Sequence, residues 1–302
     1  MKKLFSFIFL LITTLSLASC GKVELSSEVK VITPYGTPYL ALGGLIGENN
    51  VKIDAVNGAA GVQAALVSGE YDVVVAPINL GAKLFGAGKS KYVIEAVITM
   101  NNAYIITDTT NKLDSIKDLA GQKVLGFGEA GIPGSVLKNL YSKNELDTSL
   151  IDFSLSSSTA VYAAYAGGST DAKYALMSEP EISKLVINDK KEIKSLDLTK
   201  ELGVDVPQAC IYVNPNSEKQ EDIDNLLKLI ESNIKSLNKN PEDYADKIIP
   251  LDRTFEAMTK EVIVRSIPLT NITYKEVDSF KEEINNILTI LGVASPSEEF
   301  YR

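Results

Sequence analysis

The chain has 302 residues, of which 45% are hydrophobic and 23% charged, so it is long enough for one large domain or for two lobes with sizeable cores. Its formal net charge of −9 argues against nucleic acid as a partner, because phosphate neutralisation requires clustered Lys and Arg. The sequence contains no histidine, which excludes Ser-His-Asp and Cys-His nucleophile systems and removes the commonest imidazole metal ligand. We therefore expect neither a metal nor a cofactor.

The N-terminus has the features of an export signal. Lys2 and Lys3 precede an uncharged run, 4–17, that is shorter than the roughly 20 apolar residues of a membrane-spanning helix. The run ends in Leu17-Ala18-Ser19-Cys20-Gly21, which resembles the lipobox of bacterial lipoproteins, whose cysteine is acylated and becomes the mature N-terminus. The resemblance implies a cleaved signal peptide over 1–19, a lipid on Cys20, a tether over 20–28 and a protein anchored on the extracytoplasmic face of the cell membrane. An uncleaved N-terminal anchor is the alternative.

After the tether, short β-branched runs alternate with helical segments, which predicts an α/β fold with largely parallel strands. We expect Thr37 to be the N-cap of the first helix, with Pro38 after it. The other elements expected in this part are strands at 29–33, 51–56, 73–76, 92–100 and 103–107 and helices at 62–68 and 78–85.

A second cycle begins near residue 108, and the C-terminal third is helical. The apolar run 209–213 predicts that Cys210 is a small buried hydrophobe. The expected elements are a short capped helix at 115–121, strands at 123–127, 152–155 and 172–177, helices at 135–143 and 159–166, a helix opened by Glu179-Pro180, and amphipathic helices before Asn240, from Pro241 and before Gly292.

One unit of loop, helix, Gly-x-x-Asp and strand occurs twice, at 57–76 and 156–177, which suggests two similar lobes. We expect the glycines of the two units to end their helices in the left-handed conformation. We also expect Asp72 and Asp171 to start their strands by bonding local backbone.

Three segments resemble type II substrate-binding proteins of ABC importers. The run 64–73 resembles their helix followed by Ser-Gly, an acidic residue and Asp, and 113–124 resembles the entry into their second lobe. The strand ending in Ser178-Glu179-Pro180 resembles a step in the branch for sulfonates, nitrate, taurine and thiamine precursors. The resemblance covers 29–213.

This resemblance implies a two-lobed type II periplasmic-binding-protein fold, with two mixed sheets flanked by helices and a two-strand hinge. The crossovers would lie near 104–108 and 207–211. The first lobe would hold 29–107 and 212–302, and the second 108–211. The implied partners are an ABC permease, its ATPase and a small organic solute.

In open α/β sheets, ligands bind at the carboxyl ends of strands, in the loops that lead into helices. Helix N-termini there favour a weak anion such as a sulfonate, whereas the tyrosine and phenylalanine rings favour a planar heterocycle. Arg265 is expected to be structural, and with three arginines in the chain a multi-arginine clamp is excluded. Tight turns without a ligand are the alternative for the glycines. The candidate ligand-binding residues are Pro34, Tyr35, Gly36, Thr37, Gly58, Ala59, Ala76, Pro77, Asn79, Phe127, Gly128, Gly134, Ser135, Ser157 and Glu179.

The alternative function is an enzyme on the same fold, similar to a menaquinone-pathway dehydratase or a pyrimidine synthase. The dehydratase-like relatives are cytoplasmic and unlipidated, contrary to Cys20, and the pyrimidine synthase consumes an active-site histidine that this chain lacks. A lipoprotein for adhesion or signalling is a third possibility.

Overall fold

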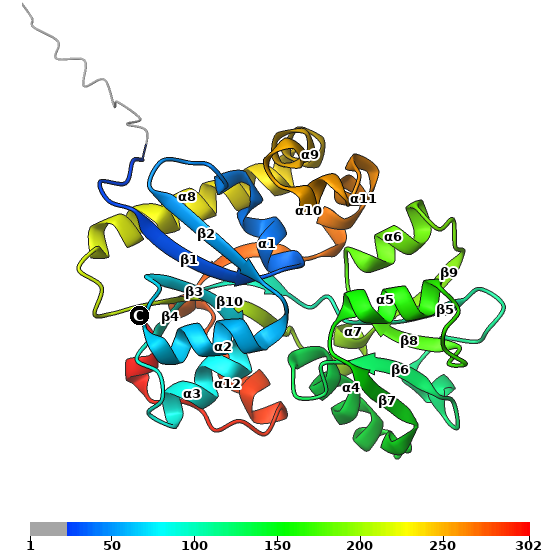
Figure 1. Cartoon of the computed structure of the whole chain (residues 1–302). Coiled ribbons are helices and arrows are strands. Elements are labelled where there is room, and N and C mark those ends of the chain that lie inside the picture. Colours follow the sequence, from blue (N-terminus) through cyan, green and yellow to red (C-terminus); the bar gives the residue numbers. More distant parts are fainter. Residues whose placement is uncertain (1–22) are drawn as a thin grey trace, which may run out of the picture.

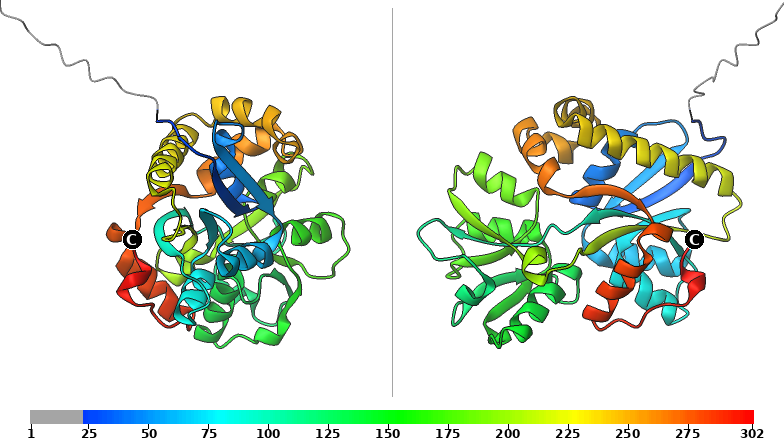
Figure 2. Two further views of the ribbon diagram at one scale, coloured as in Figure 1. Left: turned by 60° about the vertical axis from the view of Figure 1, so that its left-hand side comes forward. Right: turned by 180° about the vertical axis from the view of Figure 1, so that it is seen from behind.

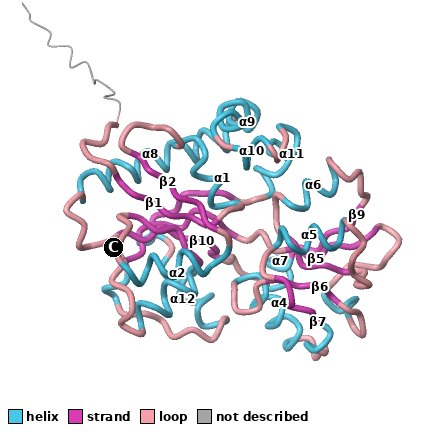
Figure 3. Tube along the Cα trace, viewed as in Figure 1, coloured by secondary structure: helices cyan, strands magenta, loops and turns pink. Residues whose placement is uncertain are grey.

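The computed structural model describes residues 23–302, so the expected signal peptide and Cys20 lie outside the described residues. Two β-sheets with flanking helices lie side by side (Figure 1), as the two-lobed α/β prediction requires. We call the six-stranded sheet with its helices the first lobe and the five-stranded sheet with its helices the second lobe. Figure 3 shows the strands of each lobe enclosed by helices.

The sheet of the first lobe is mixed and has the strand order β11-β4-β10-β3-β1-β2. Strands β1, β2 and β3 are parallel, and β10 runs antiparallel to both β3 and β4. Its strands are β1 (Val29–Pro34), β2 (Val51–Val56), β3 (Val73–Pro77), β4 (Val93–Met100), β10 (Pro207–Val213) and β11 (Ile272–Glu276).

Helices cover both faces of this sheet because successive side chains along its central strands point to opposite faces. Val73 and Val75 of β3 pack into one apolar cluster with α1, α8, α9 and α11, while Val74 and Ala76 pack into another with α2, α3 and α12. The helices of the first lobe are α1 (Thr37–Leu42), α2 (Gly58–Ser68), α3 (Ile78–Gly86), α8 (Gln220–Lys239), α9 (Pro241–Ile248), α10 (Arg253–Glu256), α11 (Lys260–Ser266) and α12 (Lys281–Ile290).

The sheet of the second lobe has the order β7-β6-β8-β5-β9, with β6, β7 and β8 parallel and β5 antiparallel to its neighbours. Its strands are β5 (Tyr104–Asp108), β6 (Val124–Phe127), β7 (Ile151–Leu155), β8 (Tyr174–Met177) and β9 (Ile193–Asp197). Its helices are α4 (Ile132–Lys143), α5 (Ser158–Ala166), α6 (Glu181–Ile187) and α7 (Leu198–Leu202).

The chain crosses between the sheets twice, through 101–103 and 203–206, and the view from behind shows both passages (Figure 2). Both lie a few residues before the predicted crossovers. Residues 104–108 form β5 of the second sheet, and 207–211 belong to β10 of the first sheet. The passages are buried at Asn102, Ala103 and Val206, so apolar packing continues from one lobe to the other.

Most predicted elements form, and the differences lie at their ends. Gly36, with φ 95°, occupies the N-cap of α1, so Thr37 is the first helical residue rather than the cap. Helices α2 and α4 begin at Gly58 and Ile132, several residues earlier than predicted, because their small first-turn residues and a proline suit the start of a helix.

The sequence patterns did not predict two of the strands, β9 and β11. Both β9 and β11 lie at a sheet edge, where side chains are partly exposed and carry little hydrophobic alternation.

The repeated unit is present in both lobes, with different details. Gly69 ends α2 in the left-handed conformation as predicted, whereas α5 ends at a right-handed Gly167 that precedes a left-handed Gly168. Asp72 does not bond local backbone. Its carboxylate accepts from the distant Lys30 N–H at 2.9 Å, because the start of β3 lies beside the start of β1. Cys210 is a free, fully buried thiol, as predicted.

No helix within residues 23–302 is both long enough and apolar enough to span a bilayer.

The packing of α3 on β10 provides a test of the first-lobe core. A Cβ at Gly81 would overlap the buried Tyr212 ring. We expect Gly81→Ala to lower the free energy of unfolding by about 1–3 kcal/mol, the usual cost of overpacking a filled core. Gly86→Ala is the matched control, because a Cβ at the end of the same helix meets open space. Equal midpoints for the two variants in urea would contradict this packing.

Candidate functional site

The candidate loops of the first lobe leave one edge of its sheet. Pro34 at the end of β1 lies beside Val56 at the end of β2, and the pairing of Ile32 with Val74 brings the end of β3 to the same level. The edge therefore carries the loops that hold Pro34–Thr37, Gly58–Ala59 and Ala76–Asn79.

The second lobe repeats this arrangement. Phe127 at the end of β6 lies beside Leu155 at the end of β7, and the pairing of Leu125 with Ala175 places the end of β8 at the same edge. The loops that leave it hold Phe127 to Ser135, Ser157 and Glu179.

The two edges face each other and are in contact. The Thr37 hydroxyl donates to the Glu179 carbonyl at 3.0 Å, and Asn79 Nδ2 donates to the Ala130 carbonyl at 3.0 Å. Candidate loops from opposite lobes, far apart in the sequence, thus meet in one place.

Asn79 has the clearest capacity to bind a further group. It lies in the first turn of α3 and is 4% exposed. Its Oδ1 accepts no hydrogen bond within the part of the chain that the structure describes, although its Nδ2 is engaged. A buried acceptor without a donor is costly, so this atom suits a ligand N–H or O–H.

Tyr35 presents an aromatic surface at the first edge. It is 41% exposed, and its ring meets the buried Tyr39 ring edge-on at 5.4 Å. Tyr39 in turn stacks on Phe255 at 4.9 Å. Burial, together with Asp252, raises the pKa of Tyr39, which stays neutral at physiological pH. Tyr35 is therefore an exposed ring on a rigid aromatic support.

Phe127, the other candidate aromatic, is partly buried and packs against apolar clusters on both faces of the second sheet. The glycines after Phe127 are required by the tight turn between β6 and α4. Gly128 has φ 60°, and a side chain on Gly134 would overlap the Gly128 carbonyl.

Two serines are engaged in local structure. Ser157 is the N-cap of α5, where its hydroxyl accepts from the Ala160 N–H at 3.2 Å. The Ser135 N–H already bonds the Gly131 carbonyl within the start of α4. By contrast, Gly58 and Ala59 are exposed in the first turn of α2, where N–H groups have no helical partner. Ala76 is buried in β3, and Pro77 is the N-cap of α3.

Glu179 lies in the contact between the lobes and is 3% exposed. Its carboxylate accepts from the Ser183 N–H at 3.0 Å and from Arg265 Nη1 of the first lobe at 3.3 Å. Burial raises the pKa of Glu179 above its usual range, although the bonds from Ser183 and the charge of Arg265 oppose the shift. Glu179 therefore joins the lobes as a buried, partly compensated charge.

Asn102 is a site residue that the sequence analysis missed. It is buried in the first passage between the sheets, its Nδ2 donates to Thr37 Oγ1 at 2.9 Å, and its Oδ1 accepts from the Glu179 N–H at 2.7 Å. Its φ of 67° is one that asparagine tolerates better than most residues. In the sequence, the Asn101-Asn102 pair directly after an apolar strand could have indicated a polar residue at this site.

Arg265 has a structural contact, as expected, and this contact is between the lobes. Its Nη1 also donates to Ser183 Oγ at 2.8 Å. Among the described residues no group of three or more His, Cys, Asp or Glu side chains could hold a metal ion.

A hollow of about 640 Å³ lies elsewhere, beside the two passages between the sheets. Tyr104, Gly203 and Leu269 are among its lining residues. None of the candidate loop residues lines it. We place the candidate site at the facing loops because they combine the strand ends, an exposed ring and a buried acceptor without a donor among the described residues.

A family model described as NMT1/THI5 like matches residues 47–244 of the chain. No curated protein sequence matches the chain. Solved structures match over most of the chain, at identities that establish the fold alone.

One similar structure is an ABC transporter protein from Parabacteroides distasonis, with a TM-score of 0.74, 17% identity and coverage of 91% of this chain and 99% of that one. The ligand-binding component of an ABC-type import system from Staphylococcus aureus, with zinc bound, has a TM-score of 0.68, 14% identity and coverage of 91% and 96%. The periplasmic aliphatic sulphonate binding protein SsuA from Escherichia coli has a TM-score of 0.67, 11% identity and coverage of 87% of both chains.

The raised pKa of Glu179 predicts a pH dependence of stability. The folded protein binds this proton more tightly than the unfolded chain, so the carboxyl favours folding at low pH. This contribution is lost as the pH rises from the unfolded value of about 4.3 through the raised folded pKa. We expect Glu179→Gln to flatten this part of the profile in urea unfolding between about pH 4 and 7. Glu261→Gln, an exposed change on α11, is the control. Identical profiles for wild type and Glu179→Gln would overturn the assignment.

Proposed function

Because the chain belongs to the NMT1/THI5-like family, we propose that it is an extracytoplasmic solute-binding protein. In this proposal a lipid on Cys20 anchors the protein. It captures a small organic molecule between its lobes and delivers that molecule to an ABC-type permease and ATPase. Solved structures of the same fold include a sulphonate binding protein and the ligand-binding component of an ABC-type import system, which supports solute capture. We assign 23–100 and 207–302 to the first lobe and 104–202 to the second, following the sheets.

The observation that carries this proposal is the pair of facing sheet edges, which meet at Thr37 with Glu179 and at Asn79 with Ala130. The lobes are connected by two short passages, so rotation about the passages would part or join the edges. We propose binding rather than catalysis, because the chain has no histidine to serve as a general base near neutral pH.

The side chains at the site favour a flat molecule with at least one hydrogen-bond donor. Tyr35 offers a ring face, and Asn79 Oδ1 offers a buried acceptor. A pyrimidine-like heterocycle meets both requirements. A weak anion such as a sulfonate is the second candidate, since the exposed first turn of α2 at Gly58 and Ala59 suits an electron-rich group.

The direct test of solute capture is a native mass spectrum of protein purified without refolding, in which we expect a retained small molecule. Adding that molecule in excess to emptied protein should decrease the radius of gyration in small-angle scattering, because bound solute would favour the form with the edges in contact over forms with the edges parted. It should also raise the unfolding free energy by about 2.7 kcal/mol at a hundredfold excess over the dissociation constant. An unchanged scattering profile and an unchanged unfolding midpoint at saturation would contradict the clamp.

Two variants separate the heterocycle from the anion. Tyr35→Ala should weaken a stacked heterocycle by roughly 2- to 12-fold, corresponding to 0.5–1.5 kcal/mol of aromatic contact. Ala59→Pro removes a first-turn N–H without breaking α2, since proline is tolerated there, and should weaken an anion instead. Titration calorimetry with the retained molecule measures the dissociation constant of each variant. Tyr35→Phe is the control, because it keeps an aromatic ring. If both Tyr35→Ala and Ala59→Pro bind the retained molecule normally, the site lies elsewhere.

The lipid anchor is tested by Cys20→Ala. This variant should remain an unprocessed precursor without acyl chains and should leave the detergent phase in a partition experiment, because stable anchoring requires two or more chains. Cys210→Ala is the matched control, since that thiol is fully buried in β10 and should not affect partitioning. Continued acylation of Cys20→Ala would show that another residue carries the lipid.

A further inference from the structure

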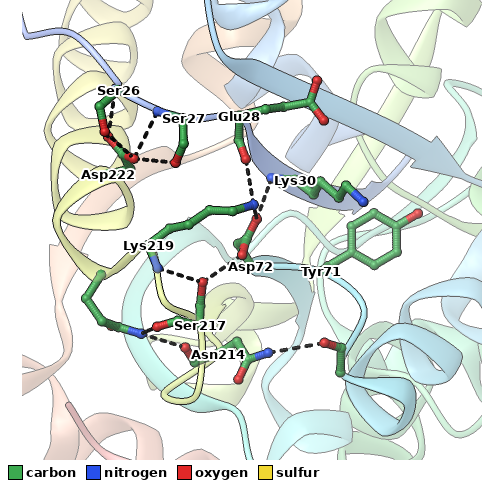
Figure 4. A network of polar contacts seen from close by, with 12 residues as sticks. Ser26, Ser27, Glu28, Lys30, Tyr71, Asp72, Asn214, Ser217, Lys219 and Asp222 are labelled. Atoms are coloured by element: carbon green, nitrogen blue, oxygen red, sulfur yellow. Dashed lines mark hydrogen bonds and ion pairs between the residues drawn. The ribbon is translucent and has the colours of Figure 1, made fainter.

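The chain that follows the expected lipid site is fastened to the first lobe by one carboxylate. Asp222 lies in the first turn of α8, and its side chain accepts from the Ser26 N–H at 2.7 Å and from the Ser27 N–H at 3.1 Å (Figure 4). The hydroxyls of both serines donate to the same carboxylate. We call the contacts of Asp222 with Ser26 and Ser27 the clasp.

The clasp is an ordered structural contact. Asp222 is 6% exposed, and the Ser27 hydroxyl, together with the other serine donors, lowers the pKa of Asp222 below its usual range. A carboxylate in the first turn of a long helix is also stabilised by the helix dipole. The clasp is therefore a charged, hydrogen-bonded contact at neutral pH.

Neighbouring contacts extend the clasp on both sides. Before it, Leu25 is buried in the first-lobe core, and Asn50 Nδ2 donates to its carbonyl at 2.7 Å. After it, Lys219 Nζ donates to the Glu28 carbonyl at 2.7 Å and to Asp72 Oδ2 at 2.9 Å. Residues 25–28 are thus held by Asp222 of α8, by Lys219 just before that helix and by Asn50 in the turn before β2.

This fastening brings the folded lobe close, along the sequence, to the expected lipid site. Four residues lie between Cys20 and the buried Leu25, and the five steps along the chain span at most roughly 17 Å when extended. If 25–28 were released, the free chain would run to the start of β1 and span roughly 30 Å. The clasp therefore nearly halves the reach of the tether.

The fastening also determines which lobe is held. All of these contacts belong to the first lobe, at the end of β1 opposite to the loop with Tyr35 and Thr37. The second lobe lies at the side of the first sheet away from residues 25–28 (Figure 1). A short tether fixed here would restrain the first lobe and leave the second free to rotate.

We propose that the Asp222 clasp shortens the tether and holds the first lobe close to a lipid surface, so that closure occurs by movement of the second lobe. The inference rests on the proposed lipid anchor. The clasp itself belongs to the folded chain and can be tested with or without the lipid.

The first measurement is hydrogen exchange on the purified protein. Asp222→Ala should speed exchange of the Ser26 and Ser27 amides by about tenfold or more, because both lose their acceptor. Asp224→Ala is the matched control, since this exposed carboxylate on the same helix pairs with Arg302 and not with the tether. The double variant S26A/S27A keeps α8 intact and should give an intermediate effect. Unchanged exchange in Asp222→Ala would overturn the clasp.

The second measurement is energy transfer from a dye at Lys143→Cys, exposed on the second lobe, to acceptor lipids in vesicles that carry the mature lipoprotein. We expect one narrow distance distribution with native Asp222 and with Asp224→Ala, and a broader, shifted one with Asp222→Ala. A broad distribution in the native protein that still floats with vesicles would overturn this inference while the anchor stands. Protein that does not float would refute the anchor, and the exchange experiment would still decide the clasp.

Discussion

Two short passages between the sheets constrain the rest of this structure. Because the chain passes between the sheets through 101–103 and 203–206, these connections determine which edges of the two sheets face each other. Carboxyl ends of parallel strands share one edge, so the loops after β1, β2 and β3 face those after β6, β7 and β8. The candidate site is a consequence of this connectivity.

The polar contacts where the lobes meet allow the loop that holds Glu179 only one arrangement against the first lobe. Glu179 is almost fully buried, and its carboxylate is matched by Arg265 and Ser183 while its backbone is matched by Thr37 and Asn102. An unmatched buried charge would be strongly destabilising, so this loop fits in one register only. The interface thereby joins the lobes by directional bonds in addition to continuous apolar packing.

The two lobes have unequal roles. The first lobe holds the first and last of the described residues and the fastened segment 25–28, whereas the second lobe is an insertion between β4 and β10. An insertion joined by two passages can rotate without disturbing the packing of α8 on the first sheet. This asymmetry suits a receptor whose first lobe is held and whose second lobe responds to solute.

Local sequence determined much of the fold. Period-two and helical patterns predicted most strands and helices, and the repeated loop, helix and Gly-x-x-Asp unit indicated two similar lobes. The edge strands β9 and β11 were missed because partly exposed strands carry little alternation. The loop positions at the strand ends were also predictable, since parallel strands place their loops at one edge.

Only the tertiary structure decided which of those loop residues are engaged and which are free. Sequence could not show that Ser157 caps a helix, that Glu179 pairs with Arg265 across the lobes, or that Asn79 keeps an acceptor without a donor. It likewise gave no sign that Asp222 holds the serines 195 and 196 positions away. Patterns along the chain report neighbours within one element, whereas these contacts join residues that only folding brings together.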